Sequence, residues 1–470
     1  MSDTRPCVIG GAQYLPPGHP SIPSVTEALT LPNPEYRQAL ALRDQGRRVE
    51  LPPETICAAT PLPMSHKWFG GLQVPRNVNL LKHGVKKFFD VKSFPPAEAV
   101  AIKGEYRLRD YQQAAVDGIF THGEGVIIAP CGAGKTSSGI GAMARLKTPA
   151  LVLVHTLDLA EQWARRCEDW LGITPSMLGG GSKDRTGRVV IGTFQTIASW
   201  SWAERYDWAK QFGLMIADES HHVPATTFSD VMSTMTAKYR MFLTATPDRP
   251  DGLSQVLYWH AGDVLHEITT PELIKRGVVM APEVRFHHSG WAPEGDRQQW
   301  SAMISTMCAD EERTASLLDW VSTFVAEGRQ VLVLSDRVAH CKAMAAELAA
   351  DDIKAVAFTG SLSKKKRQEL LRAADARELD VICATVVADE GLDLPGLDTV
   401  VLTCPVGKKS MGRIQQRIGR IMRVKEGKKV PLVFDVVDDT HEFRGLARKR
   451  YRLYLDLGCA INNEASAWDS

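Results

Sequence analysis

The 470-residue chain is predicted to be an α/β protein with two tandem parallel-sheet domains and a small N-terminal accessory domain. Short apolar runs alternate with helical patterns from about residue 105 to 280, and a second set of the same kind follows. The chain is also longer than one hydrophobic core usually serves. We expect domains at 1–100, 101–282 and 298–455, with a polar linker carrying two prolines at about 281–300.

The first hundred residues hold more than half of the 26 prolines and show little long-range periodicity. Residues 67–92 alternate apolar, aromatic and basic side chains, which suits a small sheet. Pro95 and Pro96 indicate a linker before the next domain.

The first sheet domain is predicted from five short apolar runs. These runs are 126–130, 150–156, 189–194, 214–219 and 240–246. After the second run, large side chains recur at helical spacing, at Leu159, Trp163, Cys167 and Trp170. We interpret this face as part of the core.

The second sheet domain repeats the pattern with runs at 330–336, 355–360, 380–387, 399–405 and 431–437. No shorter repeat is visible, so the two halves are predicted to be two copies of one sheet architecture.

A phosphate-binding loop is predicted where the first apolar run ends. Residues 129–136 read APCGAGKT and fit the pattern A-x-x-x-x-G-K-T. Two glycines leave room for backbone amides to surround a phosphate, and the helix that follows adds its positive end. Lys135 is expected to reach the β- and γ-phosphates of ATP, and the Thr136 hydroxyl to bind Mg²⁺. The nucleotide-binding candidates are Pro130, Cys131, Gly132, Ala133, Gly134, Lys135, Thr136 and Ser137, with no chemistry assigned to Cys131.

Two adjacent carboxylates, Asp218 and Glu219, follow the apolar run of residues 214–217. Carboxylates at the end of a buried strand are costly unless a cation meets them. Parallel sheets bind ligands at the carboxyl ends of their strands. We therefore expect Asp218 to hold Mg²⁺ and Glu219 to polarise the attacking water.

Residues 416–423 read QRIGRIMR. Gln416, Arg420 and Arg423 are spaced at i, i+4 and i+7, so a helix would place them on one face. Isoleucines would pack the other face against a sheet. Because arginine matches phosphate oxygens and stays charged when desolvated, this pattern suits recognition of a multiply charged anion.

These motifs, in this order, resemble those of helicase superfamily 2 across residues 105–437. LRDYQ (108–112) is similar to the adenine-sensing segment, and ATVVADEGLDLP (384–395) to motif V. The resemblance implies two RecA-like domains with ATP in the cleft between them, and residues 416–423 as the arginine-finger motif. It also implies that catalysis involves Lys135, Asp218, Glu219, Gln416, Arg420 and Arg423.

The same resemblance implies further roles for residues outside the phosphate loop. Arg109 and Gln112 would bind the nucleotide base, with Gly391 and Asp393 also near the nucleotide. The nucleic-acid backbone would contact Thr193, Gln195, Thr359, Thr385 and Gly391. Coupling of hydrolysis to movement would involve His221, Thr244 and Thr246.

DESH (218–221) and TATPDRPDG (244–252) resemble the branch of xeroderma pigmentosum group B-type, phage and bacterial DNA helicases more than the DEAD-box RNA helicases. The resemblance implies an ATP- and Mg²⁺-dependent DNA helicase or double-stranded DNA translocase, with DNA favoured over RNA. Two alternatives stay open: an RNA helicase, or an ATP-gated binding subunit of a repair, replication or defence complex that does not unwind alone. Protein partners would bind through the N-terminal domain.

Composition bounds the remaining possibilities. A formal net charge of +1 excludes a generally basic nucleic-acid coat, so binding requires local patches. The nine cysteines form no CxxC pair or Cys/His cluster, which argues against zinc and against a secreted disulfide framework. No apolar run of membrane-spanning length and no cleavable signal are visible. We expect a soluble cytoplasmic protein, of bacterial or phage origin.

Three stretches with basic residues have two interpretations each. Residues 67–92 suit either a surface near nucleic acid or a brace against the first sheet domain. Residues 361–372 suit a solvated helix start or a DNA contact. Residues 443–454 interleave aromatics with arginines, a pattern that can grip nucleic acid but also suits a helix packed on the second domain, which we favour.

Overall fold

The computed structural model describes residues 7–44, 47, 49–62, 71–86, 88–96, 102–103, 106–219, 223, 225–245, 253–293, 299–385, 394, 396–406 and 411–462. The chain forms two compact units. Unit 1 comprises Met1–Ala129 and Gly134–Glu267, and unit 2 comprises Pro130–Ala133 and Ile268–Ser470.

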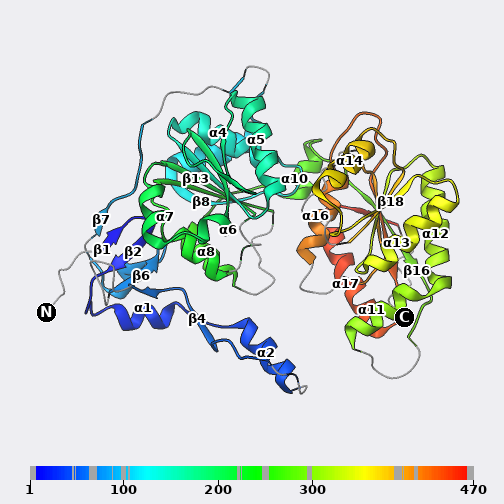
Figure 1. The fold of residues 1–470 in the computed structure, drawn as a ribbon, viewed down its shortest axis with the longest axis horizontal. Helices are drawn as coiled ribbons and strands as arrows, with labels where there is room; N and C mark the ends of the chain where they lie inside the picture. The colour runs from blue at the N-terminus through cyan, green and yellow to red at the C-terminus, as the bar shows by residue number, and fades with distance from the viewer. Residues whose placement is uncertain are drawn as a thin grey trace. The chain divides into compact units, whose positions relative to one another are not determined.

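Unit 1 is built on an eight-stranded sheet that is parallel except for one edge strand (Figure 1). In spatial order the strands are β11 (Ser182–Lys183), β10 (Ser176–Gly179), β12 (Val189–Thr193), β9 (Ala150–Val154), β13 (Leu214–Asp218), β14 (Tyr239–Thr244), β8 (Glu124–Ile128) and β15 (Val264–Glu267). The five predicted strands are confirmed, and β10, β11 and β15 are additional.

Helices cover both faces of this sheet because neighbouring strand residues point to opposite sides. One face packs α3 (Asp110–His122), α4 (Lys135–Leu146) and α5 (Leu157–Leu171). The other packs α6 (Phe194–Ala198), α7 (Trp202–Ala209), α8 (Ala225–Met232) and α9 (Ser254–Ala261). Within β9, for example, Val152 faces the first set and Leu151 the second. A sheet buried on both faces explains why its strands read as continuous apolar runs.

The N-terminal segment belongs to unit 1 and forms a small sheet, to which the expected strands within residues 67–92 contribute two members and earlier residues three. Its strand order is β5 (Thr60–Pro61), β6 (Leu72–Pro75), β2 (Ala12–Leu15), β1 (Cys7–Ile9) and β7 (Phe88–Asp90). A second pair, β3 (Thr30–Pro32) and β4 (Thr55–Cys57), accompanies α1 (Ile22–Ala28), α2 (Pro34–Asp44) and a 3-10 turn at Leu80–His83.

Buried polar contacts tie this N-terminal sheet to the main sheet of unit 1. Arg76, 5% exposed, donates to Glu124 Oε1 (3.1 Å) and to the carbonyls of residues 237 and 238. Arg240, 0% exposed, meets the other oxygen of Glu124 at 2.7–2.8 Å. Asn77 Nδ2 donates to the carbonyl of His260 (2.8 Å). These contacts support the brace interpretation of residues 67–92.

Unit 2 is built on a seven-stranded, fully parallel sheet (Figure 1). In spatial order the strands are β18 (Ala355–Phe358), β19 (Val381–Ala384), β17 (Val331–Leu334), β20 (Thr399–Leu402), β21 (Leu432–Val437), β16 (Glu283–His288) and β22 (Ala460–Ile461). The five predicted strands are again confirmed.

The helices of unit 2 pack around that sheet. One core combines the strands with α12 (Glu311–Ala326) and α13 (Val338–Ala350). Two others, α16 (Met411–Ile421) and α17 (His441–Asp456), contact β20 and β21, respectively. The remaining helices are α10 (Thr270–Lys275), α11 (Trp300–Ala309) and α14 (Lys364–Asp375).

The basic tail is a packed helix, as favoured from the sequence. In α17, Phe443, Ala447, Arg450 and Tyr454 are buried. Arg450 donates to both oxygens of Asp435 (2.6 and 2.7 Å), and the Tyr454 hydroxyl donates to the same carboxylate (2.5 Å). A fully buried arginine paired in this way holds the helix to β21.

The expected linker at 281–300 is wrong for residues 283–288, which form β16. This strand alternates half-exposed and buried residues, and it pairs with β21 and β22 on its two sides. The main part of unit 2 starts at Ile268, before the predicted start at residue 298, and includes β22 beyond the predicted end at 455. Within the described part of the chain, no helix is long and apolar enough to cross a membrane.

Candidate functional site

The predicted phosphate loop connects the carboxyl end of β8 to α4. The Ala129 amide donates to the Thr244 carbonyl (2.9 Å), so the loop leaves the sheet beside β14. Gly132 and Gly134 adopt φ values of +86° and +80°, a region that favours glycine. A Cβ on Gly134 would also lie 2.4 Å from Gln112 Nε2. The amides at the start of α4 therefore open onto a loop that only glycine can form without strain, as phosphate binding requires.

Lys135 is the first residue of α4 and lies at the carboxylate pair. Its ammonium is 3.0 Å from Glu219 Oε1 and donates to the Ala129 carbonyl (3.1 Å). Thr136 and Ser137 follow it in the first turn and are half-buried. The structure thus brings Lys135 and Glu219 together although 83 positions separate them in the sequence.

Asp218 ends β13 and is 4% exposed. Its Oδ2 accepts a hydrogen bond from the Trp163 indole (2.8 Å), whereas nothing among the described residues donates to its buried Oδ1. The pKa of Asp218 is raised to about 6, mainly by burial and also by the Glu219 carboxylate, which together outweigh the lowering by Lys135 and the Trp163 N–H. A buried carboxylate oxygen without a protein donor fits a cation ligand.

Glu219 follows with a different environment and a strained backbone. Its φ is +47°, uncommon for a residue other than glycine. Its amide donates to the Leu243 carbonyl (2.9 Å), and its Oε2 accepts from the Ala245 amide (3.3 Å). These contacts and Lys135 fix the Glu219 carboxylate beside the phosphate loop. Strain of this kind is found at functional sites.

The Asp218 oxygen, the Thr136 hydroxyl and the phosphate loop are groups that suit magnesium bound to a nucleotide. Mg²⁺ is usually held by one or two protein oxygens together with substrate phosphates. The residues present therefore fit the implied ion.

The adenine-sensing candidates stand at the start of α3. The Arg109 amide donates to Gln112 Oε1 (2.9 Å), which caps the helix and fixes the amide side chain. Gln112 is 3% exposed and contacts Gly134 of the phosphate loop. Arg109 Nη1 donates to the Tyr111 hydroxyl (3.3 Å). The segment is thus adjacent to the phosphate loop, as the predicted nucleotide site requires.

The candidates for backbone contact and coupling lie at carboxyl ends of strands. In unit 1, Thr193 ends β12 and caps α6, Gln195 is exposed, and Thr244 ends β14. In unit 2, Thr359 follows β18 and Thr385 follows β19, two strands whose last residues are paired. Their contacts with nucleic acid stay predictions. His221, Thr246, Gly391 and Asp393 lie outside the described residues.

The arginine-finger motif differs from the predicted helix at its end. Ile414, Ile418 and Ile421 are fully buried, as expected. However, α16 ends at Ile421, and Arg423 forms an antiparallel bridge with Val279. The prediction that Arg423 continues the helical face of Gln416 and Arg420 is therefore wrong.

The helix ends before Arg423 because a neighbouring segment forms a hydrogen bond with the chain after α16: the Met280 amide donates to the Met422 carbonyl (2.7 Å). Gln416 is buried, with 7% of its surface exposed. Arg420, by contrast, is half-buried within the helix.

Trp163 is the residue whose role the sequence did not reveal. We interpreted it as core, and it is buried at 1% exposure, but its indole N–H reaches Asp218. Helical spacing places it on the core face and cannot show that a carboxylate lies opposite.

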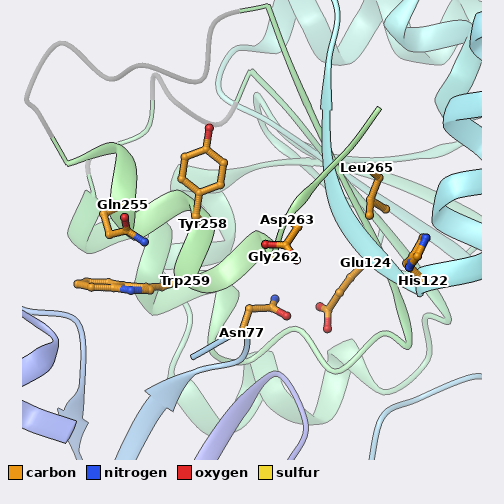
Figure 2. A pocket seen from close by; sticks show the side chains of 9 residues that line it. All are labelled: Asn77, His122, Glu124, Gln255, Tyr258, Trp259, Gly262, Asp263 and Leu265. Atoms are coloured by element: carbon orange, nitrogen blue, oxygen red, sulfur yellow. The ribbon is translucent and has the colours of Figure 1, made fainter. Parts of the chain in front are cut away.

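A pocket of about 380 Å³ includes the first residue of β8 in its lining (Figure 2). Asn77, Gln255, Trp259, Glu124 and Asp263 are among the residues that line it. Glu124 is the first residue of β8, and its carboxylate is paired with Arg76 and Arg240, whereas the phosphate loop begins after the last residue of β8. This pocket is therefore not the nucleotide site.

Family models match both sheet domains. Residues 105–249 match the model described as Type III restriction enzyme, res subunit, and residues 313–425 match the helicase conserved C-terminal domain. Together the two matches cover more than half of the chain. The chain belongs to helicase superfamily 2. Within it, the chain is similar to proteins of the XPB type, with 27–28% identity.

Curated relatives agree with the superfamily assignment, and a solved structure shares the fold. The superfamily 2 chain is 27% identical over 427 residues to the DNA 3'-5' translocase XPB2 of Sulfurisphaera tokodaii, covering 82% of this chain and 95% of that protein. It is 29% identical over 343 residues to the putative DNA 3'-5' helicase Rad25 of Haloarcula marismortui, covering 71% of this chain but about half (53%) of that relative. The crystal structure of the DUF1998 helicase MrfA bound to DNA, 16% identical, matches with a TM-score of 0.58 over 79% of this chain and 53% of that one. This last match shows a shared fold.

Proposed function

We propose that the protein is an ATP-dependent DNA helicase or double-stranded DNA translocase. The observation that carries the proposal is the constellation in unit 1, where Lys135, Asp218 and Glu219 meet at a glycine loop. The arrangement suits phosphoryl transfer to water, a reaction in which positioning and electrostatics supply most of the catalysis.

In this proposal each residue has a distinct part. The loop amides and Lys135 hold the β- and γ-phosphates, Thr136 and Asp218 hold Mg²⁺, and Glu219 orients the attacking water. Mg²⁺ would supply charge neutralisation on the phosphate oxygens. Because the Lys135 ammonium contacts Glu219, an incoming phosphate competes for this lysine and leaves the glutamate free to act on water.

Unit 2 contributes the remaining catalytic candidates, Gln416, Arg420 and Arg423. An arginine finger is worth about 10³–10⁵ in rate, so hydrolysis would be slow until these residues act on the same nucleotide. Nucleic acid that binds both units would favour that state and stimulate the ATPase. Repeated cycles would then move the protein along one strand.

The names of the relatives support DNA as the polymer and a 3'-to-5' direction. Hydroxyl and amide side chains such as Thr193, Gln195, Thr359 and Thr385 would contact the sugar–phosphate backbone, which carries little sequence information.

The test is steady-state ATP hydrolysis measured with no polymer, single-stranded DNA, duplex DNA and RNA, with Lys135→Ala as the inactive control. We expect stimulation by DNA. Stimulation by RNA alone would contradict the assignment of the polymer, and hydrolysis unaffected by any polymer would contradict the motor. Strand displacement, compared with displacement of a bound protein from duplex DNA, then separates unwinding from translocation. Failure of both despite DNA-stimulated hydrolysis would favour a partner-dependent subunit.

A further inference from the structure

The indole of Trp163 is held in place by packing against two other elements of unit 1. Trp163 lies on α5, 1% exposed, in the core between that helix and the sheet. A Cβ on Gly139 of α4 would lie 2.5 Å from Trp163 Cη2 and 3.2 Å from the Ile216 side chain of β13. Glycine inside a helix costs roughly 1 kcal/mol relative to alanine. Because Gly139 has no side chain, the tryptophan ring fits between α4 and β13.

The single polar group of the ring, its N–H, contacts one carboxylate oxygen. The indole nitrogen is a donor only, and it donates to Asp218 Oδ2 at 2.8 Å. A bond to a charged acceptor is stronger than a neutral one. With Oδ2 occupied, Oδ1 is the oxygen that no described residue contacts through a hydrogen bond.

We propose that Trp163 is a positioning residue for the Mg²⁺-binding carboxylate of Asp218, which it holds through its N–H so that Oδ1 serves the cation. The inference rests on the proposed function of this site. Outer contacts that orient a metal-binding side chain typically change metal affinity by about 10–100-fold. The alternative is that Trp163 only fills the core, and the two roles predict different results.

The same helix supplies a matched control. Trp170 lies seven residues later on the same buried face, 8% exposed, and stacks on Tyr106 with ring centroids 4.7 Å apart. Nothing in the described part of the chain accepts a hydrogen bond from its indole nitrogen. Trp170→Phe therefore removes an unpaired N–H, whereas Trp163→Phe removes the one that contacts Asp218.

The experiment uses the full chain and two readouts. The first is affinity for Mn²⁺ in the presence of saturating ADP, followed by the electron paramagnetic resonance signal of free Mn²⁺, which needs no turnover. The second is the Mg²⁺ concentration that half-activates ATP hydrolysis. For Trp163→Phe we expect Mn²⁺ affinity to fall about tenfold and the Mg²⁺ requirement to rise by a similar factor. Turnover at saturating Mg²⁺ should recover to within about threefold, which a purely structural defect would not allow.

Trp170→Phe should leave both values within about twofold of the wild type. Equal values for the two variants would overturn the proposal. If Trp163→Phe does not fold, Gly139→Ala displaces the ring without deleting its N–H, and unchanged Mn²⁺ affinity there would overturn the proposal equally. A wild-type protein that binds Mn²⁺ but does not hydrolyse ATP would contradict the proposed function alone, because the Mn²⁺ comparison still decides the role of Trp163.

Discussion

Asp218 and Glu219 are neighbours in the sequence but have different surroundings. Asp218 belongs to the buried strand and keeps one oxygen without a protein donor, whereas Glu219 turns out of the strand at positive φ and pairs with Lys135. Because adjacent carboxylates repel one another, this division places one beside the cation site and the other beside an ammonium group. The order of the two residues thus agrees with the different roles that we propose.

The first residue-scale prediction concerns Lys135. Lys135→Ala removes the cation that faces Glu219 and the expected phosphate contact, so ATP hydrolysis should fall by at least about 10²–10³. Steady-state hydrolysis with DNA present measures this loss. The control is Lys210→Ala, which removes an exposed lysine paired with Asp207 and should keep wild-type turnover. Normal ATP hydrolysis by Lys135→Ala would contradict the assignment of residues 129–136 as a phosphate-binding loop.

The second residue-scale prediction concerns His260. This residue is fully buried, and its ring nitrogens have no hydrogen-bond partner among the described residues. Burial, with a smaller contribution from Arg240, lowers the pKa of His260 to about 3. As the pH falls below about 6.5, this imidazole binds a proton in the unfolded chain but stays neutral in the folded protein. The free energy of unfolding therefore decreases on acidification below that pH. His260→Met should remove this loss and gain about 2 kcal/mol relative to wild type at pH 5.

Thermal or urea unfolding at pH 5 and 7.5 measures the difference. His122→Gln, a change at an exposed histidine of the same unit, should leave the pH dependence of stability as it is in the wild type. An unaltered acid dependence in His260→Met would mean that other groups cause it.

At the scale of elements, strands that are continuous apolar runs were predictable, and strands that carry polar residues were not. Most of the ten predicted strands are buried because helices cover both faces of each sheet, whereas the edge strand β18 is half-exposed but still apolar. β15 and β16 carry half-exposed residues, so a polar residue interrupts the run. Likewise the helix preceding Arg423 ends where a distant segment bonds to it, which local periodicity cannot reveal.

The same limit applies to the N-terminal segment. Its small sheet followed from alternation, but its attachment depends on Arg76 and Arg240, which share Glu124 in the interior. Burial raises the pKa of Glu124, but the two arginines outweigh it and hold that pKa below the usual range. No pattern in the sequence links three charged residues so far apart.

Breaking this network is the element-scale prediction. Arg76→Met removes one partner of a buried ion pair and the donors to two carbonyls, so unit 1 should lose about 3–5 kcal/mol. Urea unfolding followed by tryptophan fluorescence measures the loss. Lys366→Met breaks an exposed pair with Glu369 and should cost less than about 1 kcal/mol. A loss of stability below about 1 kcal/mol for Arg76→Met as well would show that this network does not hold the N-terminal sheet.

At the scale of the whole molecule, the proposed activity depends on groups from both units. Unit 1 carries Lys135 and the two carboxylates, and unit 2 carries Arg420 on a helix packed through three buried isoleucines. Because the isoleucines anchor α16, we expect the helix to survive a change at Arg420. A structural arginine and a catalytic one are therefore distinguishable by experiment.

Arg420→Ala should leave ATP affinity within a fewfold of wild type and lower DNA-stimulated hydrolysis by about 10³–10⁵, equivalent to about 4–7 kcal/mol of transition-state stabilisation. The reason is that an arginine finger acts on charge that develops at the γ-phosphate during hydrolysis, whereas binding rests on the phosphate loop. Equilibrium binding of a fluorescent ATP analogue and steady-state turnover separate the two effects, with Lys365→Ala, a change at an exposed lysine of α14, as the control. A parallel loss of thermal stability and nucleotide affinity would instead make Arg420 part of the fold of unit 2, and hydrolysis at the wild-type rate would remove it from the mechanism.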